Sequence, residues 1–212
     1  MRLLLLAICL PVLLNSCKLM KKKDAKETTK NKNSMTNRFK PVTWAHTTNI
    51  YEVNVRQYTP EGTLNAFALQ MPRLKNMGVK TLWFMPLTPI AQKNKKGSLG
   101  SYYACSDYTS INPEFGTLED FKSLVKQAHE MGFKVIIDWV ANHTGWDHKW
   151  TMEHPEYYQK DSSTNDFKIA SGMDDIIELD FKNPALRKAM KDAMAFWINE
   201  CDIDGFRCDL AF

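Results

Sequence analysis

The final residues of the chain place an arginine and an aspartate two positions apart within a short apolar segment, Gly205 to Phe212. If this segment is a strand, its side chains alternate between two faces, so Arg207 and Asp209 lie on the same face. Burying an arginine or a carboxylate is costly unless the two are paired. Two interpretations are therefore open: a structural ion pair that closes the strand end, or a carboxylate that Arg207 keeps ionised for nucleophilic attack.

A second group of polar residues follows another apolar segment. The run from Phe133 to Ile137 predicts a buried strand, and Asp138, Asn142 and His143 come after it. The sequence contains no Cys-x-x-Cys pair or clustered histidines, which argues against a zinc-type site. No glycine-rich phosphate loop follows a predicted strand, so the sequence indicates no nucleotide or other organic cofactor.

Strands and helices that could position these residues alternate along the chain. Pro72 should interrupt the first helix, Thr117 and Asp120 form a capping box for the second, and Asn183 caps the third. The predicted strands are 49–55, 79–84, 133–137 and 205–209. The predicted helices are 63–78, 117–132 and a third that starts at Asn183 and Pro184.

This alternation, with nearly continuous apolar strands, predicts an α/β fold in which helices cover a parallel sheet. A doubly wound sheet and a TIM (β/α)8 barrel both fit. Long loops at 86–116 and 139–182, together with polar residues at strand ends, favour the barrel, because a barrel builds its active site at that face. The chain then supplies the first half of a barrel, about four β/α units, with a long loop after strand three.

Four segments of the sequence, taken in chain order, are 103–117, Asp138 to His143, Ile177 to Asp180 and Gly205 to Asp209. In this order they closely resemble the signature segments of the alpha-amylase family of glycoside hydrolases (glycoside hydrolase family 13), and Ile177 to Asp180 is the weaker match. The resemblance covers roughly residues 50–212.

The resemblance implies a retaining hydrolase of alpha-glucosidic bonds in starch-like glucans or maltooligosaccharides. Asp209 would be the nucleophile, held ionised by Arg207. In the substrate site, His143 would hydrogen-bond the sugar at the cleaved bond and Tyr103 would stack on it. Asp138, in the same site, would fix Arg207 and the strand end rather than react.

The resemblance also implies groups that this chain does not contain. A retaining glycosidase needs a second carboxyl about 5–5.5 Å from the nucleophile, and no residue here substitutes for the family's acid/base glutamate. We therefore expect an N-terminal piece of a longer enzyme, inactive by itself. Asn142 resembles a calcium ligand of the family. Phe212 stands where the family often has lysine, which leaves calcium binding open.

Two further expectations concern sugar contacts and the reaction. Trp139, Trp146 and Trp150, in the loop after strand three, are candidate sugar platforms. The same fold also fits a transglycosylase, an alpha-glucosidase or a sugar isomerase. A lipid-anchored, non-catalytic glucan-binding protein is the alternative from another class.

The N-terminal segment predicts export. Residues 1–17 read as a signal peptide with a short apolar run, and their end resembles a bacterial lipoprotein box with Cys17 as the lipid anchor. An ordinary cleaved signal with an incidental cysteine is the alternative. Residues 18–43 predict a flexible polar tether, and residues 44–212 the half barrel. We expect a secreted, membrane-anchored lipoprotein at the bacterial outer membrane or cell surface, with the periplasmic side left open.

Charge and cysteine usage exclude other classes. The net charge of +4 comes from lysines and arginines in the N-terminal segment, so the sequence predicts no nucleic-acid partner. Beyond Cys9 and Cys17, the odd set Cys105, Cys201 and Cys208 indicates no disulfide scaffold. We expect Cys208 to point away from Arg207 and Asp209 and to pack against the rest of the fold.

Overall fold

The computed structural model describes residues 40–210. One compact unit begins at Thr48, and the described part of the preceding unit contains the short 3-10 helix η1 (Thr43–Thr47). The proposed signal peptide, Cys17, residues 18–39 of the tether and Phe212 lie outside the described residues. Among residues 40–210, no helix combines the length and the apolar character needed to cross a membrane.

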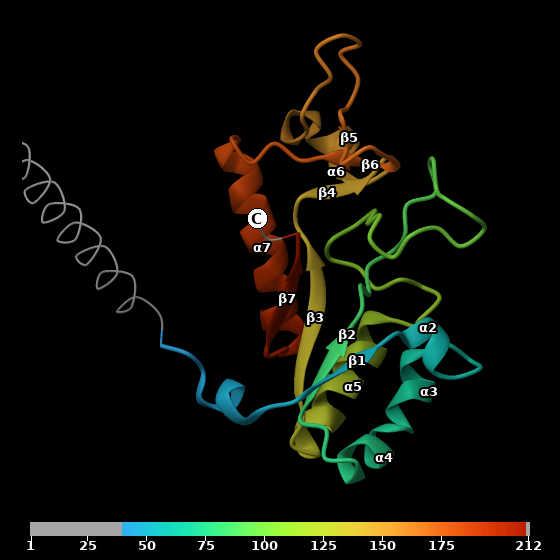
Figure 1. Ribbon diagram of the computed structural model, residues 1–212, viewed down its shortest axis with the longest axis vertical. Coiled ribbons are helices and arrows are strands. Elements are labelled where there is room, and N and C mark those ends of the chain that lie inside the picture. The colour runs from blue at the N-terminus through green and yellow to red at the C-terminus, as the bar shows by residue number, and fades with distance from the viewer. Residues whose placement is uncertain (1–39, 211–212) are drawn as a thin grey trace, which may run out of the picture. The chain divides into compact units, whose positions relative to one another are not determined.

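Four parallel strands form the main sheet, as the sequence predicts (Figure 1). They are β1 (Ile50–Val53), β2 (Thr81–Phe84), β3 (Lys134–Val140) and β7 (Gly205–Asp209), in the order β1-β2-β3-β7. The register pairs Asp138 of β3 with Arg207 of β7, and Val140 with Asp209. The two polar segments found in the sequence therefore lie side by side.

Helices connect these strands at the predicted places. They are α2 (Val55–Tyr58), α3 (Leu64–Ala68), α4 (Met71–Asn76), α5 (Leu118–Glu130) and α7 (Pro184–Cys201). The predicted break at Pro72 separates α3 from α4, with the proline in the first turn of α4. The capping box of Thr117 and Asp120 is present, and the Asn183 side chain accepts from the N–H of Ala185.

An aromatic chain joins these helices to one face of the sheet. Phe84 of β2 contacts Phe67 of α3 at 5.3 Å between ring centroids and Phe121 of α5 at 5.9 Å. Phe121 in turn contacts Trp197 of α7 at 5.8 Å. All four side chains are fully buried, and each contributes on the order of 1.5–3 kcal/mol by leaving water. This layer joins α3, α5 and α7 to β2.

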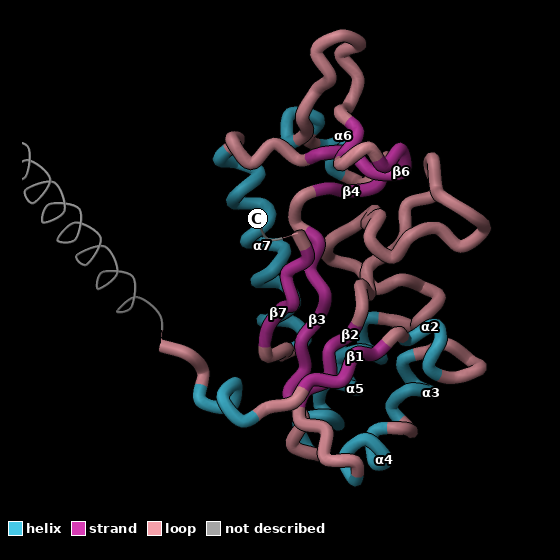
Figure 2. The backbone as a smooth tube through the Cα atoms, viewed as in Figure 1, coloured by secondary structure: helices cyan, strands magenta, loops and turns pink. Residues whose placement is uncertain are grey.

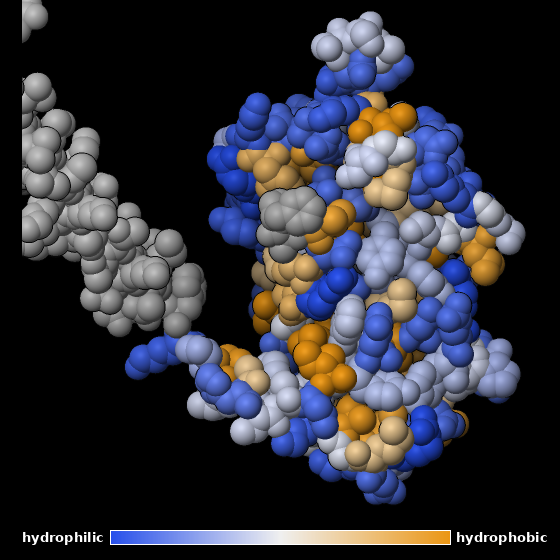
Figure 3. Space-filling view, viewed as in Figure 1, coloured by the Kyte–Doolittle hydropathy of each residue, from blue (hydrophilic) through white to orange (hydrophobic). Residues whose placement is uncertain are grey.

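The opposite face of the sheet carries Asp138, Arg207 and Asp209 together with apolar side chains. Trp83 follows the alternation of β2 away from Phe84, and it is only half-buried. Ile50 of β1 is 57% exposed. In the space-filling view, hydrophobic residues reach the surface between hydrophilic ones rather than in one continuous patch (Figure 3).

The expected long loop after the third strand is wrong in one respect, because residues 139–182 contain a small antiparallel sheet. Its strands are β4 (His143–Gly145), β5 (Ile169–Ala170) and β6 (Met173–Glu178), in the order β4-β6-β5. The short helices α6 (Trp150–Glu153) and η2 (Pro155–Tyr157) lie in the same segment. These strands are two to six residues long, and β4 pairs with β6 across more than thirty positions, so the sequence carries little periodic signal for them.

Three other expectations need correction. β3 continues to Val140, so Asp138 lies inside the strand rather than after it. β1 ends at Val53, because Val55 already begins α2. Cys208 is exposed rather than packed, because β7 has a neighbour on one side only among the described strands.

The long connections gather at one end of the main sheet. Figure 1 and Figure 2 show the loop after β2 and the small sheet of β4, β5 and β6 at one end of the main sheet, the end toward which the strand arrows of Figure 1 point. The N–H of Gly145 in β4 donates to the carbonyl of Cys105 in the loop after β2, at 2.9 Å. The two connections therefore form one body above the strand ends, where a barrel builds its site.

Gly145 permits this contact, and we expect Gly145→Ala to destabilise the protein. A Cβ atom there would collide with the Ala91 side chain and lie 3.3 Å from the carbonyl oxygen of Ala104. Overpacking of this kind costs about 1–3 kcal/mol of unfolding free energy. Urea unfolding measures the effect, with Gly205→Ala as control, because its Cβ meets only Ile136 Cγ2 at 3.6 Å. Equal losses in the two variants would contradict the prediction.

Candidate active site

Arg207 is the centre of the polar cluster at the ends of β3 and β7. Its Nη1 lies 2.7 Å from Asp209 Oδ1 and 3.0 Å from Asp138 Oδ1. Asp138 is the register partner of Arg207, and Asp209 lies two residues further along β7, so all three side chains are on the same face of the sheet. One guanidinium therefore holds both carboxylates, and the Asp209 side chain remains 23% exposed. In the part of the protein that the structure describes, the Asp209 carboxylate is therefore the more accessible of the two carboxylates.

Asp138 is the buried member of the cluster, with no exposed side-chain surface. Burial raises the pKa of its carboxyl, and the ion pair with Arg207 opposes that rise. The Tyr103 hydroxyl also donates to Asp138 Oδ2, at 3.3 Å. Burial, with Asp138 and Asp209 nearby, raises the pKa of Tyr103 to about 12, so the phenol keeps its proton.

Trp83 belongs to the cluster although the sequence analysis did not single it out. The Arg207 guanidinium lies 4.9 Å from the centre of the Trp83 ring, on the face of the sheet opposite Phe84. A cation over an indole at this distance is attracted by the ring's negative face. The alternation of β2 could have identified Trp83, but only once β2 was known to lie beside β3.

His143 and Asn142 lie beyond the end of β3. His143 begins β4 and is 2% exposed, and neither of its ring nitrogens has a well-formed hydrogen bond. Burial lowers the pKa of His143, against the opposing effects of the Tyr103 backbone and of the charges of Asp209 and Asp175, so the ring is neutral near pH 7. A neutral imidazole can offer one N–H donor to a sugar hydroxyl.

The structure brings most of the predicted site residues together. Arg207, Asp209, Asp138 and Tyr103 form one contact network, and the charge of Asp209 acts on His143. Asn142 lies next to the weaker motif, because its carbonyl accepts from the N–H of Leu179 at 3.1 Å.

Two of the three candidate sugar platforms are wrong. Trp139 and Trp150 are 2% and 7% exposed and belong to the core, where both contact the ring of Tyr108 at 5.1 Å. Trp146 is half-buried, and its Nε1 donates to the carbonyl of Asp174. A tryptophan in a loop-rich segment either packs into the core or keeps one ring face exposed, where a sugar could stack. The sequence does not show which of the two holds.

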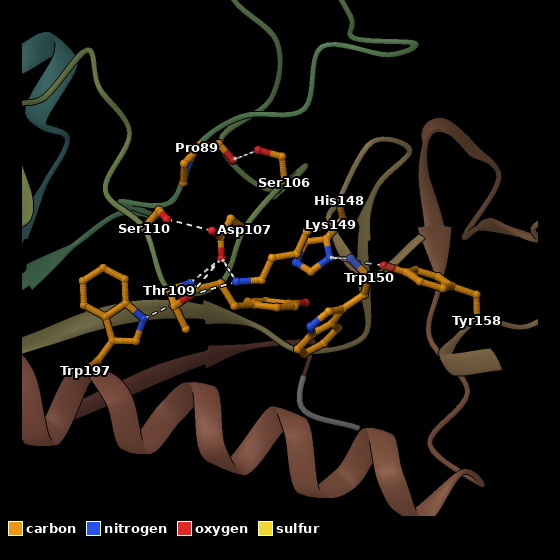
Figure 4. A network of polar contacts seen from close by, with 11 residues as sticks. Pro89, Ser106, Asp107, Thr109, Ser110, His148, Lys149, Trp150, Tyr158 and Trp197 are labelled. Atoms are coloured by element: carbon orange, nitrogen blue, oxygen red, sulfur yellow. Dashed lines mark hydrogen bonds and ion pairs between the residues drawn. The ribbon is translucent and has the colours of Figure 1, made fainter. Parts of the chain in front are cut away.

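A network of polar contacts surrounds Asp107 (Figure 4). Lys149 Nζ lies 2.7 Å from Asp107 Oδ1, and the side chains of Thr109 and Ser110 donate to the same carboxylate. Burial alone would raise the pKa of Asp107, but these partners outweigh it and lower the pKa to about 2. The network joins the loop after β2 to the segment after β4.

We expect Asp107→Asn to remove part of the protein's stability at neutral pH. The folded-state pKa is below the unfolded value, so the ionised carboxylate stabilises the fold above about pH 4, and that contribution is lost as pH falls toward 2. The loss at pH 7 should be about 2 kcal/mol. Urea unfolding at pH 7 and pH 3 measures it. A variant as destabilised at pH 3 as at pH 7 would contradict the prediction.

The sequence of this chain is similar to those of known proteins. Residues 23–175 and 156–211 match the family profile described as "Alpha amylase, catalytic domain". The chain belongs to the alpha-amylase family. Alpha-amylase 3 of Dictyoglomus thermophilum is 31% identical over 79% of this chain. Trehalose synthase of Pimelobacter sp. is also 31% identical, over 78% of the chain.

Solved structures of the alpha-amylase family share the fold. The crystal structure of an alpha-amylase from Lactobacillus plantarum is 40% identical and superimposes with a TM-score of 0.73 over 76% of this chain. The chain spans 37% of the Dictyoglomus protein, 34% of the Pimelobacter protein and 38% of the Lactobacillus chain. The four parallel strands and their helices correspond to the first half of a TIM barrel.

Calcium is a separate question for this member of the alpha-amylase family. Asn142 Oδ1 is buried without a partner, as a ligand oxygen would be. Calcium takes about six to eight oxygens, and residues 40–210 contain no group of three His, Cys, Asp or Glu placed to hold a metal. Calcium at Asn142 stays a proposal, which a calcium-dependent rise in the unfolding midpoint would support.

Proposed function

We propose that the protein carrying this chain is a retaining hydrolase of alpha-glucosidic bonds in starch-like glucans or maltooligosaccharides. The observation that carries the proposal is the carboxylate of Asp209, partly open to solvent and bonded to Arg207 at the end of β7. Family membership supports the substrate class.

In the proposed reaction, an Asp209 oxygen attacks the anomeric carbon and the glycosidic C–O bond breaks. The leaving oxygen takes a proton from an acid that this chain does not supply. Water then attacks the same carbon and gives a proton back to that deprotonated acid, the bond to Asp209 breaks, and the sugar leaves with its original configuration. Arg207 holds the nucleophile and His143 offers an N–H to the sugar. The proposed Tyr103 stacking keeps the ring over Asp209.

The experiment that tests the proposal uses the full-length protein and maltoheptaose. Proton NMR during the first turnovers should show new reducing ends in the alpha configuration, before mutarotation. Initial beta product would overturn the retaining mechanism. Binding of maltoheptaose without any released sugar would favour the non-catalytic glucan-binding alternative.

A second reaction class has support from the comparisons. The Pimelobacter relative is called a trehalose synthase and is as similar to this chain as the Dictyoglomus amylase. A transglycosylase, an alpha-glucosidase or a sugar isomerase is therefore the alternative. Product analysis separates them: new linkages in the sugar products would indicate transfer or isomerisation, and shorter maltooligosaccharides alone would indicate hydrolysis.

We also propose that Cys17 carries a lipid that holds the protein at a bacterial membrane. Its support is the apolar run from Leu3 to Leu14, which is followed by Asn15-Ser16-Cys17. In cells fed labelled palmitate, the wild type should carry label in the membrane fraction, and Cys17→Ser should carry none. An unlabelled wild type would favour an ordinary cleaved signal peptide.

A further inference from the structure

The turn between β3 and β4 carries Asn142 and His143. Asn142 Oδ1 and both ring nitrogens of His143 are buried and lack hydrogen-bond partners in the structure. The directions of these side chains therefore depend on the backbone of the turn, which runs from Val140 to His143.

One side chain holds both ends of this turn. The Tyr108 hydroxyl lies 2.8 Å from the carbonyl oxygen of Val140 and 3.0 Å from that of His143. Both carbonyls can only accept, so the hydroxyl shares its single proton between them in a bifurcated bond. Burial raises the pKa of Tyr108 well above its usual range, so this donor stays protonated.

Tyr108 is itself held from several sides. Its ring centroid lies 5.1 Å from Trp139, 4.9 Å from His148 and 5.1 Å from Trp150. Its carbonyl accepts from Trp197 Nε1 at 2.7 Å. Figure 4 shows His148, Trp150 and Trp197 around this region, with the Asp107 network beside them. Because the Tyr108 ring is packed on several sides, its hydroxyl has little freedom to shift with the Val140–His143 turn.

We propose that Tyr108 is a positioning residue, whose hydroxyl sets the Val140–His143 turn and thereby aims the His143 imidazole at the substrate. The inference rests on the proposed function for its effect on activity. Tyr108 is 2% exposed and does not touch the sugar, so its action passes entirely through the turn.

Tyr158 provides a matched control for the loss of a buried tyrosine hydroxyl. It is 4% exposed and lies in the same region. Its hydroxyl bonds Thr144 Oγ1 at 3.0 Å and lies 3.4 Å from His148 Nδ1, but it touches neither end of the turn. Tyr158→Phe should therefore cost stability comparable to Tyr108→Phe without redirecting His143.

The test is a double-mutant cycle in the full-length protein, with maltoheptaose as substrate. Tyr108→Phe should lower kcat about tenfold with a smaller change in KM, because misaiming of a sugar contact is felt most in the transition state. Tyr158→Phe should leave kcat near that of the wild type. In a His143→Ala background, Tyr108→Phe should cause little further loss, since the group it aims is gone. Equal losses from Tyr108→Phe with and without His143 would overturn the proposal, as would unchanged kcat.

A second readout does not depend on activity. In protein labelled with 13C at histidine Cε1, the signal that disappears in His143→Ala identifies His143. That signal should shift or broaden in Tyr108→Phe and stay in place in Tyr158→Phe. Identical spectra for the two phenylalanine variants would overturn the proposal. A wild type that releases no sugar would overturn the proposed function instead, and the NMR arm would still decide the role of Tyr108.

Discussion

Asp209→Asn should abolish hydrolysis of maltooligosaccharides while leaving the fold intact. In the wild type, Arg207 Nη1 lies 2.7 Å from Asp209 Oδ1. The asparagine amide has the same size and keeps an oxygen that can accept this hydrogen bond. It cannot attack the anomeric carbon, because a neutral amide lacks the required nucleophilicity. Losses from removing a nucleophile are on the order of 10⁴–10⁶-fold in kcat. Reducing-sugar release measures the effect, and trapping with a fluorinated glycosyl fluoride should label Asp209 in the wild type only.

Asp204→Asn is the control for this variant. Asp204 precedes the other end of β7 and is similarly shielded, with 12% of its side chain exposed. Its carboxylate pairs with Lys134 at 2.6 Å and with His129 at 2.8 Å, far from the proposed chemistry. This variant should lower the unfolding midpoint and keep kcat. Asp209→Asn retaining several per cent of wild-type kcat would remove Asp209 from the role of nucleophile.

Arg207→Met should have the second largest effect, on stability and activity together. It leaves the fully buried Asp138 carboxylate with the Tyr103 hydroxyl at 3.3 Å as its remaining side-chain partner. An unpaired buried charge of this kind costs about 2–3 kcal/mol, after allowance for the 38% exposure of Arg207. Loss of the group that holds Asp209 should also lower kcat/KM about 10²–10³-fold. Urea unfolding and initial rates measure the two effects.

Arg56→Met is the matched control, with the same substitution at an ion pair of similar length. Arg56 Nη2 lies 2.6 Å from Glu114 Oε2, but the Glu114 side chain is 49% exposed. Water can solvate that carboxylate once the arginine is gone, so the cost should be about 1 kcal/mol, including the lost stacking on Tyr102. If Arg207→Met costs no more than Arg56→Met, the burial of Asp138 does not determine the stability of the cluster.

The pH dependence of the Arg207→Met deficit follows from the Asp138 carboxyl. Burial raises its pKa in the folded state and Arg207 opposes that rise, so removing Arg207 should raise the pKa further. A folded state with the higher pKa binds more protons, and its stability falls as pH rises from the unfolded pKa of about 3.9 through the folded value. The deficit against the wild type should therefore be complete at pH 7 and smaller at pH 4.

Features set by neighbouring residues could be predicted from the sequence. The capping box of Thr117 and Asp120 and the break at Pro72 depend on contacts within one helical turn. The shared face of Arg207 and Asp209 depends only on the two-residue period of a strand, and the 2.7 Å ion pair confirms it. The order of the four main strands and of the helices between them required no more than this.

Features set by distant residues could not be predicted in the same way. The small sheet pairs His143 with Glu178, and Trp197 donates to the Tyr108 carbonyl across 89 positions. Trp139 and Trp150 were candidate sugar platforms because aromatic residues in a loop look alike until their neighbours are known. Their burial around Tyr108 comes from segments that no local pattern connects.

The amino-acid sequence by itself determined the alternation of the main strands and helices and the pairing of Arg207 with Asp209. The order of its motifs also indicated the alpha-amylase family. Only the tertiary structure decided that Trp83 lies over Arg207, that Asp138 is the fully buried carboxylate and that Tyr108 holds the turn bearing His143. The reason is physical: periodicity and capping act over a few residues, whereas burial and cross-strand contacts depend on which distant segments pack together.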